Sequence, residues 1–230
     1  MIPPPEFTLT PLGDSALVLA FAPRIDPDLN DRVHAIAAAL LAALGTDRVE
    51  CVPAYHTLTV HFDPMQDDYE SIAQAIAGLP ECHDAKPHNA RDIVLPVCYD
   101  ARLAPDLQAV AEYTGLGVEA LVNLHSGADY RVYFLGFKPG FAYLGGLPEA
   151  LHMPRKDSPR LNVLAGSVGI GGAQTGIYPG PSPGGWQLIG RTPNRLFDLQ
   201  QSPPSFLQPG DRLRFQRVSF EEFVAMGGVP

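Results

Sequence analysis

The residues best suited to chemistry lie between Phe134 and Pro193, where aromatic, cationic and amide side chains are interspersed with glycine and proline. Aromatic side chains on stiff, glycine-permitted turns form a shaped apolar pocket, and a few polar groups at its edge orient a small ligand. With a cation at the pocket mouth, the predicted substrate-binding residues are Lys138, Phe141, Tyr143, Arg155, Gln174, Tyr178 and Trp186, the last being the only tryptophan of the chain.

Three side chains are candidates for a catalytic role. Arg155 and Arg160 each follow a proline, and a guanidinium on a stiffened loop suits bidentate binding of a carboxylate or a phosphate. His125 ends a predicted helix, where a protonated imidazole would be favoured by the helix dipole, so it is either an ordinary C-terminal helix histidine or a site residue. In the alternative interpretation of the whole stretch, the glycines serve only the corners of a barrel and Trp186 fills its core.

The sequence motifs of several common enzyme classes and binding sites are absent from this chain. No G-x-x-x-x-G-K-[ST] sequence is present, and Gly169–Gln174 lacks the third glycine of a dinucleotide fingerprint, so we expect no nucleotide site of either kind in this chain. Ser182 fits G-x-S-x-G by letter, but the prolines on both sides are incompatible with the strand-to-helix elbow of a hydrolase. No His-x-x-x-His or Cys-x-x-Cys pair occurs, and we therefore expect no metal site.

Composition narrows the class of ligand and the compartment. The net charge is −9 and no cluster of Lys or Arg occurs, which argues against nucleic acid or an anionic membrane as the main ligand. The longest apolar run, Ala35–Leu44, is too short to span a bilayer, and the N-terminus lacks the features of a secretory signal. Three cysteines at irregular spacing are typical of reduced thiols. We expect a cytoplasmic protein.

The first region, residues 1–88, has the pattern strand, strand, helix, strand, strand, helix. Asp26 and Pro27 begin a helix whose apolar residues recur at helical spacing until Gly45 ends it. Thr57–Phe62 alternates between apolar and polar residues, which indicates a strand with one buried face. A second helix is predicted to begin after Asp68. The pattern favours a small antiparallel sheet with two helices on one face, an α/β sandwich domain.

The second region, residues 89–230, follows a polar linker predicted at residues 80–91. Strands are predicted over residues 93–98 and 130–137, with short helices between them over 105–113 and 118–125. Beyond Gly136, short apolar pieces alternate with glycine and proline turns, and residues 195–199 are one of these pieces. That spacing favours a β-barrel or sandwich whose loops carry the site, and the whole chain is predicted to be α+β.

Long motifs of this chain resemble the family of 5-oxoprolinase B subunits, also called allophanate hydrolase subunit 1, the carboxyltransferase C/D family or KipI-like. The resemblance is carried by Gly136–Leu144, Pro154-Arg155, Ala165–Ile170, Gln174–Pro179 and Ser182–Pro193, and it extends to Gly13–Leu17, Pro53–Tyr55 and Pro96–Tyr99. It therefore covers nearly the whole chain. It implies an N-terminal α/β domain followed by a cyclophilin-like β-barrel.

The resemblance also implies an activity and partners. Members of the family pair with a cyclophilin-like C subunit and work with an A subunit in the ATP-dependent opening of 5-oxo-L-proline to L-glutamate. We therefore expect one component of a hydrolase, inactive alone, with ATP used by the complex. Two alternatives remain open: a regulatory protein that inhibits a sensor histidine kinase, and a component for biotin-dependent urea carboxylation or allophanate hydrolysis, although no Met-Lys-Met biotinylation motif occurs here.

Overall fold

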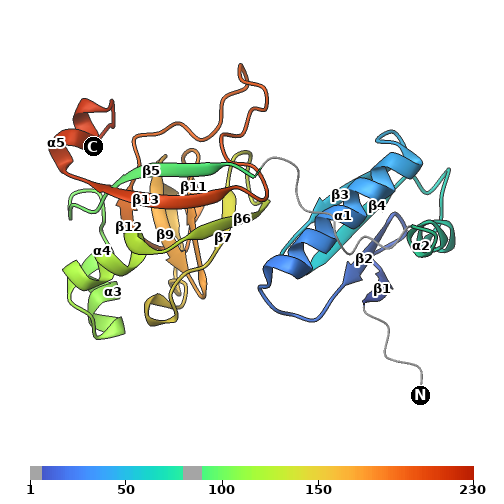
Figure 1. Ribbon diagram of the computed structural model, residues 1–230, viewed down its shortest axis with the longest axis horizontal. Coiled ribbons are helices and arrows are strands. Elements are labelled where there is room, and N and C mark those ends of the chain that lie inside the picture. The colour runs from blue at the N-terminus through green and yellow to red at the C-terminus, as the bar shows by residue number, and fades with distance from the viewer. Residues whose placement is uncertain (1–6, 80–89) are drawn as a thin grey trace. The chain divides into compact units, whose positions relative to one another are not determined.

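The computed structural model describes residues 7–79 and 90–230 (Figure 1). The chain divides into two compact units, residues 1–88 and 89–230, and each has its own hydrophobic core. The predicted linker at residues 80–91 falls almost entirely outside the described residues. No helix in the described parts of the chain is long and apolar enough to cross a bilayer.

The first unit is a four-stranded antiparallel sheet with helices packed on it. Its elements are β1 (Thr8–Pro11), β2 (Ala16–Ala20), α1 (Pro27–Leu44), β3 (Val49–Pro53), β4 (Thr57–Phe62) and α2 (Tyr69–Ala77). The strand order is β1-β2-β4-β3, with every neighbouring pair antiparallel. Helix α1 contacts β3 and β4, and Figure 1 shows it lying along the sheet. The predicted order of strands and helices is therefore confirmed.

Both helices of this unit begin at a capping aspartate. The Asp26 carboxylate accepts a hydrogen bond from the backbone N–H of Leu29 at 3.0 Å, and α1 ends where Gly45 takes a φ of 89°. The Asp68 carboxylate accepts from the N–H of Ser71, whose hydroxyl in turn accepts from the Asp68 N–H. These local bonds explain why the ends of the helices were readable from the sequence.

The second unit is a closed seven-stranded barrel, in the order β10-β7-β6-β13-β5-β12-β9, with β10 also pairing with β9. A separate two-stranded sheet pairs β11 with β8. The elements are β5 (Asp92–Cys98), α3 (Leu107–Thr114), α4 (Val118–Gly127), β6 (Tyr130–Leu135), β7 (Ala142–Gly145), the 3-10 turn η1 (Glu149–Leu151), β8 (Arg160–Val163), β9 (Ser167–Gly171), β10 (Gln174–Ile177), β11 (Ser182–Gly184), β12 (Gln187–Arg191), β13 (Arg212–Val218) and α5 (Phe220–Ala225). The α+β class and the barrel are confirmed.

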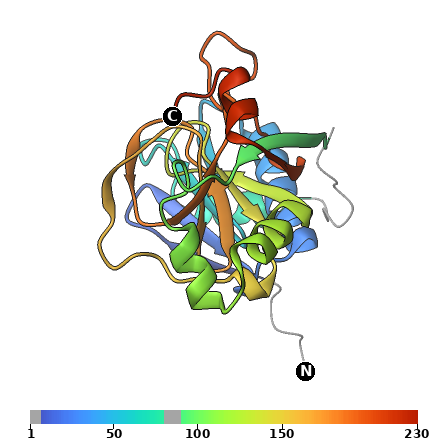
Figure 2. The same ribbon diagram turned by 90° about the vertical axis from the view of Figure 1, so that its left-hand side faces the viewer.

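Three helices pack on this barrel. Helices α3 and α4 contact each other and lie against β12 and β13 respectively, whereas α5 contacts β5. Figure 2 shows α3 and α4 in green beside one another, and α5 in red at a different part of the barrel surface. Leucine, isoleucine and valine side chains from the strands and from α3 and α4 form the core.

In this unit one predicted strand is wrong and one helix was missed. Residues 195–199 form no strand: only an isolated bridge joins Phe197 to Ser205, because the chain turns back there through a bond from the Asp198 N–H to the Pro204 carbonyl. Helix α5 was not predicted. Its signal was a capping box, in which Ser219 and Glu222 each accept a hydrogen bond from the other's backbone N–H.

Candidate functional site

An aromatic pocket of about 90 Å³ lies in the barrel unit, and its buried rings belong to a cluster separate from the main core. It is lined by Phe137, Phe141, Tyr143, Arg155, Tyr178, Gly184, Gly185 and Trp186. These residues come from the turn before β7, β7 itself, the segment before β8, the residues after β10, and the junction of β11 with β12. Five of the seven predicted substrate-binding residues are thus brought together, namely Phe141, Tyr143, Arg155, Tyr178 and Trp186.

The Phe141 ring organises the pocket wall. Its centroid lies 5.0 Å from that of Tyr143, 5.3 Å from that of Tyr178 and 5.5 Å from that of Trp186, each in an edge-to-face arrangement. Such contacts between aromatic rings are favourable beyond their burial. Glycine is required beneath Trp186, because a Cβ on Gly171 would lie 2.6 Å from the indole Nε1. The glycines therefore create the pocket wall as well as the barrel corners.

Phe137 stands at the rim of the pocket in an unusual conformation. It is the one described residue other than glycine with a positive φ, 66°, and the Lys138 N–H donates to the Gly136 carbonyl across it at 2.7 Å. This three-residue turn is strained for a residue with a side chain. The Phe137 ring is 60% exposed at the pocket edge and meets the rings of Phe141 and Tyr178 edge to face.

Arg155 supplies the positive charge of the pocket. Its guanidinium carbon lies 5.8 Å from the centroid of the Trp186 ring. No carboxylate in the described parts of the chain pairs with it. Burial raises the pKa of both Tyr143 and Tyr178, and the charge of Arg155 acts in the opposite direction on each. A cation over an aromatic floor, with two neutral phenols beside it, suits a small anionic ligand.

Arg160, the other arginine candidate, does not line the pocket. Its Nη2 donates to Asp106 Oδ1 at 2.6 Å, and Lys156 Nζ donates to the same oxygen at 3.1 Å. Both cations are thus occupied by a carboxylate about fifty residues earlier in the chain. The two Pro-Arg sequences look alike, but of the two arginines only Arg155 lines the aromatic pocket, whereas Arg160 is paired through Nη2 and its buried Nη1 has no hydrogen-bond partner among the described residues.

Residues 7–207 match the family described as carboxyltransferase domain, subdomain C and D. The chain belongs to this family. It is 40% identical over 232 residues to the B subunit of 5-oxoprolinase from Bacillus subtilis (strain 168), covering 96% of each chain. It is also 43% identical over 205 residues to the B subunit of 5-oxoprolinase from Escherichia coli O157:H7, covering 89% of this chain and 93% of that one. The resemblance read from the motifs is confirmed.

Solved structures share the fold of this carboxyltransferase-domain chain. A crystal structure of TTHA0988 is 39% identical with a TM-score of 0.77 and matches 90% of this chain, which spans only 40% of that longer chain. The conserved uncharacterized protein PH0987 from Pyrococcus horikoshii is 44% identical with a TM-score of 0.56, covering 94% of this chain and all of that one. The Kluyveromyces lactis urea carboxylase, 19% identical with a TM-score of 0.75 over 95% of this chain and 22% of that one, shares the fold alone.

In this carboxyltransferase-domain chain His125 lies in the barrel interior, away from the aromatic pocket. Its imidazole is fully buried and stacks on Phe215 at 4.8 Å. The Thr175 hydroxyl donates its one hydrogen to the Gly169 carbonyl at 2.9 Å and so accepts from His125 Nε2–H at 3.1 Å. His125 Nδ1 then accepts from the Tyr99 hydroxyl at 2.8 Å. Burial lowers the pKa of His125 to about 3. Complete burial thus opposes the protonated form that the helix dipole alone would favour, and His125 does not line the aromatic pocket.

Two further predicted substrate-binding residues lie outside the pocket lining. Lys138 Nζ donates a hydrogen bond to the Pro181 carbonyl at 2.8 Å, which links the turn before β7 to the loop before β11. Gln174 begins β10, and its buried Oε1 accepts no hydrogen bond from any described residue. Across residues 7–79 and 90–230, no group of three His, Cys, Asp or Glu side chains is arranged to hold a metal ion.

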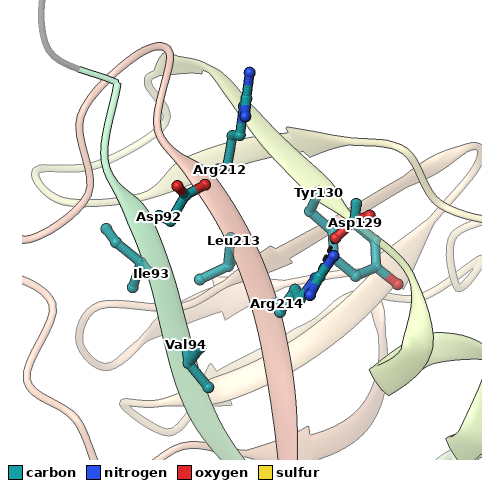
Figure 3. Close-up of a pocket in the computed structure, with 8 residues that line it drawn as sticks. All are labelled: Asp92, Ile93, Val94, Asp129, Tyr130, Arg212, Leu213 and Arg214. Carbon is teal, nitrogen blue, oxygen red and sulfur yellow. Dashed lines mark hydrogen bonds and ion pairs between the residues drawn. The ribbon is translucent and has the colours of Figure 1, made fainter.

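A larger cavity of about 480 Å³ lies at another part of the barrel (Figure 3). It is lined by Asp92, Ile93, Val94, Asp129, Tyr130, Arg212, Leu213 and Arg214. Figure 3 shows Asp129 and Arg214 directed toward each other in an ion pair, and the two side chains are 72% and 68% exposed. Exposed ion pairs of this kind are well solvated, so each contributes little free energy to stability. No predicted site residue lies there, and the aromatic pocket remains the better candidate.

Proposed function

We propose that this chain is the B subunit of an ATP-dependent 5-oxoprolinase, which opens 5-oxo-L-proline to L-glutamate together with the A and C subunits. The observation that carries the proposal is the pocket of about 90 Å³ with Arg155 at its edge. 5-Oxoproline has a small apolar ring and one carboxylate. The ring would lie against the aromatic side chains, and Arg155 would bind the carboxylate in a charge-assisted pair. The 5-oxoprolinase relatives at 40% and 43% identity support the same activity.

The residues that line the pocket support a role in binding the substrate, with the hydrolysis itself depending on partner subunits. Opening the lactam requires water to add to the ring carbonyl carbon, the C–N bond to break and the nitrogen to take up a proton. Among the residues that line the pocket, only Tyr143, Arg155 and Tyr178 can ionise, and burial raises the pKa of both phenols. None of the three acts as a general base near neutral pH. We therefore propose that the chain alone binds substrate without hydrolysing it.

ATP would enter at the level of the complex. Transfer of the γ-phosphoryl group of ATP to the lactam oxygen makes the ring carbon more electrophilic toward water, and a nearby cation stabilises the negative charge that develops. After the C–N bond breaks, a second water releases the phosphoryl group from the new carboxyl group, so that the products are glutamate, ADP and phosphate. This chain carries neither of the two common nucleotide motifs, so we assign ATP binding to a partner protein of the complex. We place the complex in the cytoplasm.

The test is release of glutamate from 5-oxoproline and ATP, first with this chain alone and then with its cognate A and C subunits. Activity is expected only in the mixture. In the mixture, Arg155→Ala should raise KM for 5-oxoproline about tenfold to a hundredfold, because a charge-assisted hydrogen bond is lost. Arg195→Ala is the matched control, since Arg195 pairs with Asp198 at the surface. An unchanged KM in Arg155→Ala would refute the assigned role of this residue.

A second candidate function is biotin-dependent carboxyl transfer, which is favoured by the similarity of this chain to urea amidolyases. The chain is 29% identical over 143 residues to the urea amidolyase of Saccharomyces cerevisiae, covering 54% of this chain and 8% of that one. The match is lower and shorter than those to the two bacterial 5-oxoprolinase proteins. If folded A and C subunits gave no glutamate in any mixture, carboxyl transfer to urea with a biotin-carrying partner would be the next activity to assay.

A further inference from the structure

Asp106 is a buried carboxylate with an unusual set of partners. Its side chain is 5% exposed and lies just before α3, outside the aromatic pocket. Oδ1 accepts from Lys156 Nζ and from Arg160 Nη2, and Oδ2 accepts from the Leu188 N–H at 2.7 Å. Burial opposes ionisation, but the hydrogen bonds from Arg160, Leu188 and Lys156 outweigh it, so that the pKa of Asp106 is lowered. The group is therefore charged at neutral pH.

The groups that Asp106 holds follow the pocket cation closely in the chain. Lys156 comes directly after Arg155, and Arg160 comes five residues after Arg155, at the start of β8. The backbone is held in the same place, because the Lys156 N–H donates to the Gly185 carbonyl at 2.7 Å. Leu188, the third partner of Asp106, comes two residues after Trp186. One carboxylate thus joins the segment that carries Arg155 to the strand that follows the pocket tryptophan.

From this arrangement we propose that Asp106 is a positioning residue that holds Arg155 over Trp186 and toward the bound carboxylate. Asp106 also holds Lys156 and Arg160 outside the pocket, which leaves Arg155 as the one cation among the residues that line it. The identity of the ligand, though not the positioning itself, rests on the proposed function. Lys156 and Arg160 side chains are only 32% and 27% exposed, so loss of their shared counter-charge would leave two largely buried cations unpaired. The segment would then be held only by neutral bonds such as those from the Lys156 N–H to Gly185 and from Gln187 Nε2 to the Pro154 carbonyl.

Positioning and simple electrostatics predict opposite results. Replacing Asp106 by asparagine removes a negative charge near the pocket, so an electrostatic role alone would tighten the binding of an anion. A positioning role weakens binding, because Arg155 no longer meets the carboxylate in the right geometry. The sign of the change in affinity therefore distinguishes the two explanations.

The experiment is a titration of the purified full chain with 5-oxoproline, followed by the fluorescence of its single tryptophan, Trp186. The variants are Asp106→Asn, Arg155→Ala and the double variant, with circular dichroism as the check of folding. Asp211→Asn is the matched control: Asp211 is also a buried carboxylate held by an arginine, Arg91, but it does not line the pocket. If Asp106→Asn does not fold, Arg160→Gln removes one of the two ion pairs and replaces it in the scheme.

We expect Asp106→Asn to weaken binding about tenfold, with no further loss when it is added to Arg155→Ala. Asp211→Asn should bind as the wild type does. Two results would overturn the proposal. One is tighter binding of 5-oxoproline by Asp106→Asn, and the other is a loss of affinity on adding Asp106→Asn to Arg155→Ala that equals its loss in the wild type.

The fluorescence of Trp186 also separates failure of this proposal from failure of the proposed function. If the wild-type chain does not bind 5-oxoproline, the proposal that the chain alone binds substrate is refuted, but the positioning role is still measured by acrylamide quenching without ligand. Trp186 is 4% exposed and Arg155 lies over its ring. Both Asp106→Asn and Arg155→Ala should increase quenching, and the double variant should match Arg155→Ala. Wild-type quenching in Asp106→Asn would refute the positioning role.

Discussion

Acidification should destabilise the barrel through His125. The imidazole is fully buried among Tyr99, Thr175 and Phe215, and both ring nitrogens already have partners. Protonation at Nδ1 would place an uncompensated charge in the core and remove the acceptor of the Tyr99 hydroxyl. The pKa of His125 is therefore lowered from 6.5 to about 3 in the folded chain.

The sign and size of the effect follow from the linkage between protonation and folding. Between pH 6.5 and about 3, the unfolded chain binds a proton at His125 that the folded chain does not, so the free energy of unfolding falls as the pH falls. The stabilisation is fully present above the unfolded pKa. From pH 7 to pH 4, this one group should remove about 3 kcal/mol of stability, since each pKa unit corresponds to about 1.4 kcal/mol.

The assay compares urea denaturation of the wild type with that of His125→Gln at several pH values between 4 and 7, with Trp186 fluorescence as a reporter confined to the barrel unit. Carboxylates contribute equally to both proteins, so the difference between their pH slopes isolates His125. His61→Gln is the matched control for the substitution itself, since it makes the same change at an exposed position in the first unit, outside the barrel that Trp186 reports on. Equal pH slopes in the wild type and in His125→Gln would refute the reasoning, as would an NMR titration of His125 with a midpoint near 6.5.

Three further outcomes test other parts of the structure. Gly171→Ala places a Cβ 2.6 Å from Trp186 Nε1, so we expect a loss of about 1–3 kcal/mol in urea denaturation and a shifted tryptophan emission; unchanged emission would contradict the packing. Asp211→Asn removes the carboxylate that accepts from Arg91 Nε and Nη2, and should cost about 1–3 kcal/mol by the same measurement, whereas wild-type stability would show the pair to be dispensable. Burial raises the pKa of Cys51 to about 11, so alkylation by iodoacetamide at pH 8, followed by peptide mass spectrometry, should be about a hundredfold slower than in the denatured chain; comparable rates would refute its burial.

Local signals explain which parts of the fold were predictable. The helix α1 was readable because Asp26 caps it, Pro27 suits its first turn and its apolar residues recur at helical spacing. The pairing of β5 with β13 was not readable, because these parallel strands are more than a hundred residues apart and only the closed barrel brings them together. Sequence patterns give the elements and their faces, whereas the partner of each strand depends on contacts remote in the chain.

The same distinction explains the site. The aromatic residues of the pocket could be predicted from the sequence, because a run of aromatic residues interspersed with glycines is typical of a shaped apolar pocket. Lys138 could not be separated from the lining residues, since nothing in its neighbourhood shows that its ammonium bonds to the Pro181 carbonyl. Arg155 and Arg160 were indistinguishable, since both follow a proline and the residue that separates their roles, Asp106, is about fifty positions away.

Asp106 and Asp211 together show how one kind of interaction serves two purposes in this barrel. Each is a single buried carboxylate that accepts backbone N–H and guanidinium donors from distant segments. Asp211 joins Arg91, just before β5, to the residues before β13, so its loss should lower stability without reaching the aromatic pocket. Asp106 joins the Arg155 segment to β12, so its loss should also change what the pocket binds. If both variants lost stability and neither changed ligand affinity, the two carboxylates would be equivalent supports of the fold. The geometry of Arg155 would then be held by the other bonds of its segment, from the Lys156 N–H to the Gly185 carbonyl and from Gln187 Nε2 to the Pro154 carbonyl.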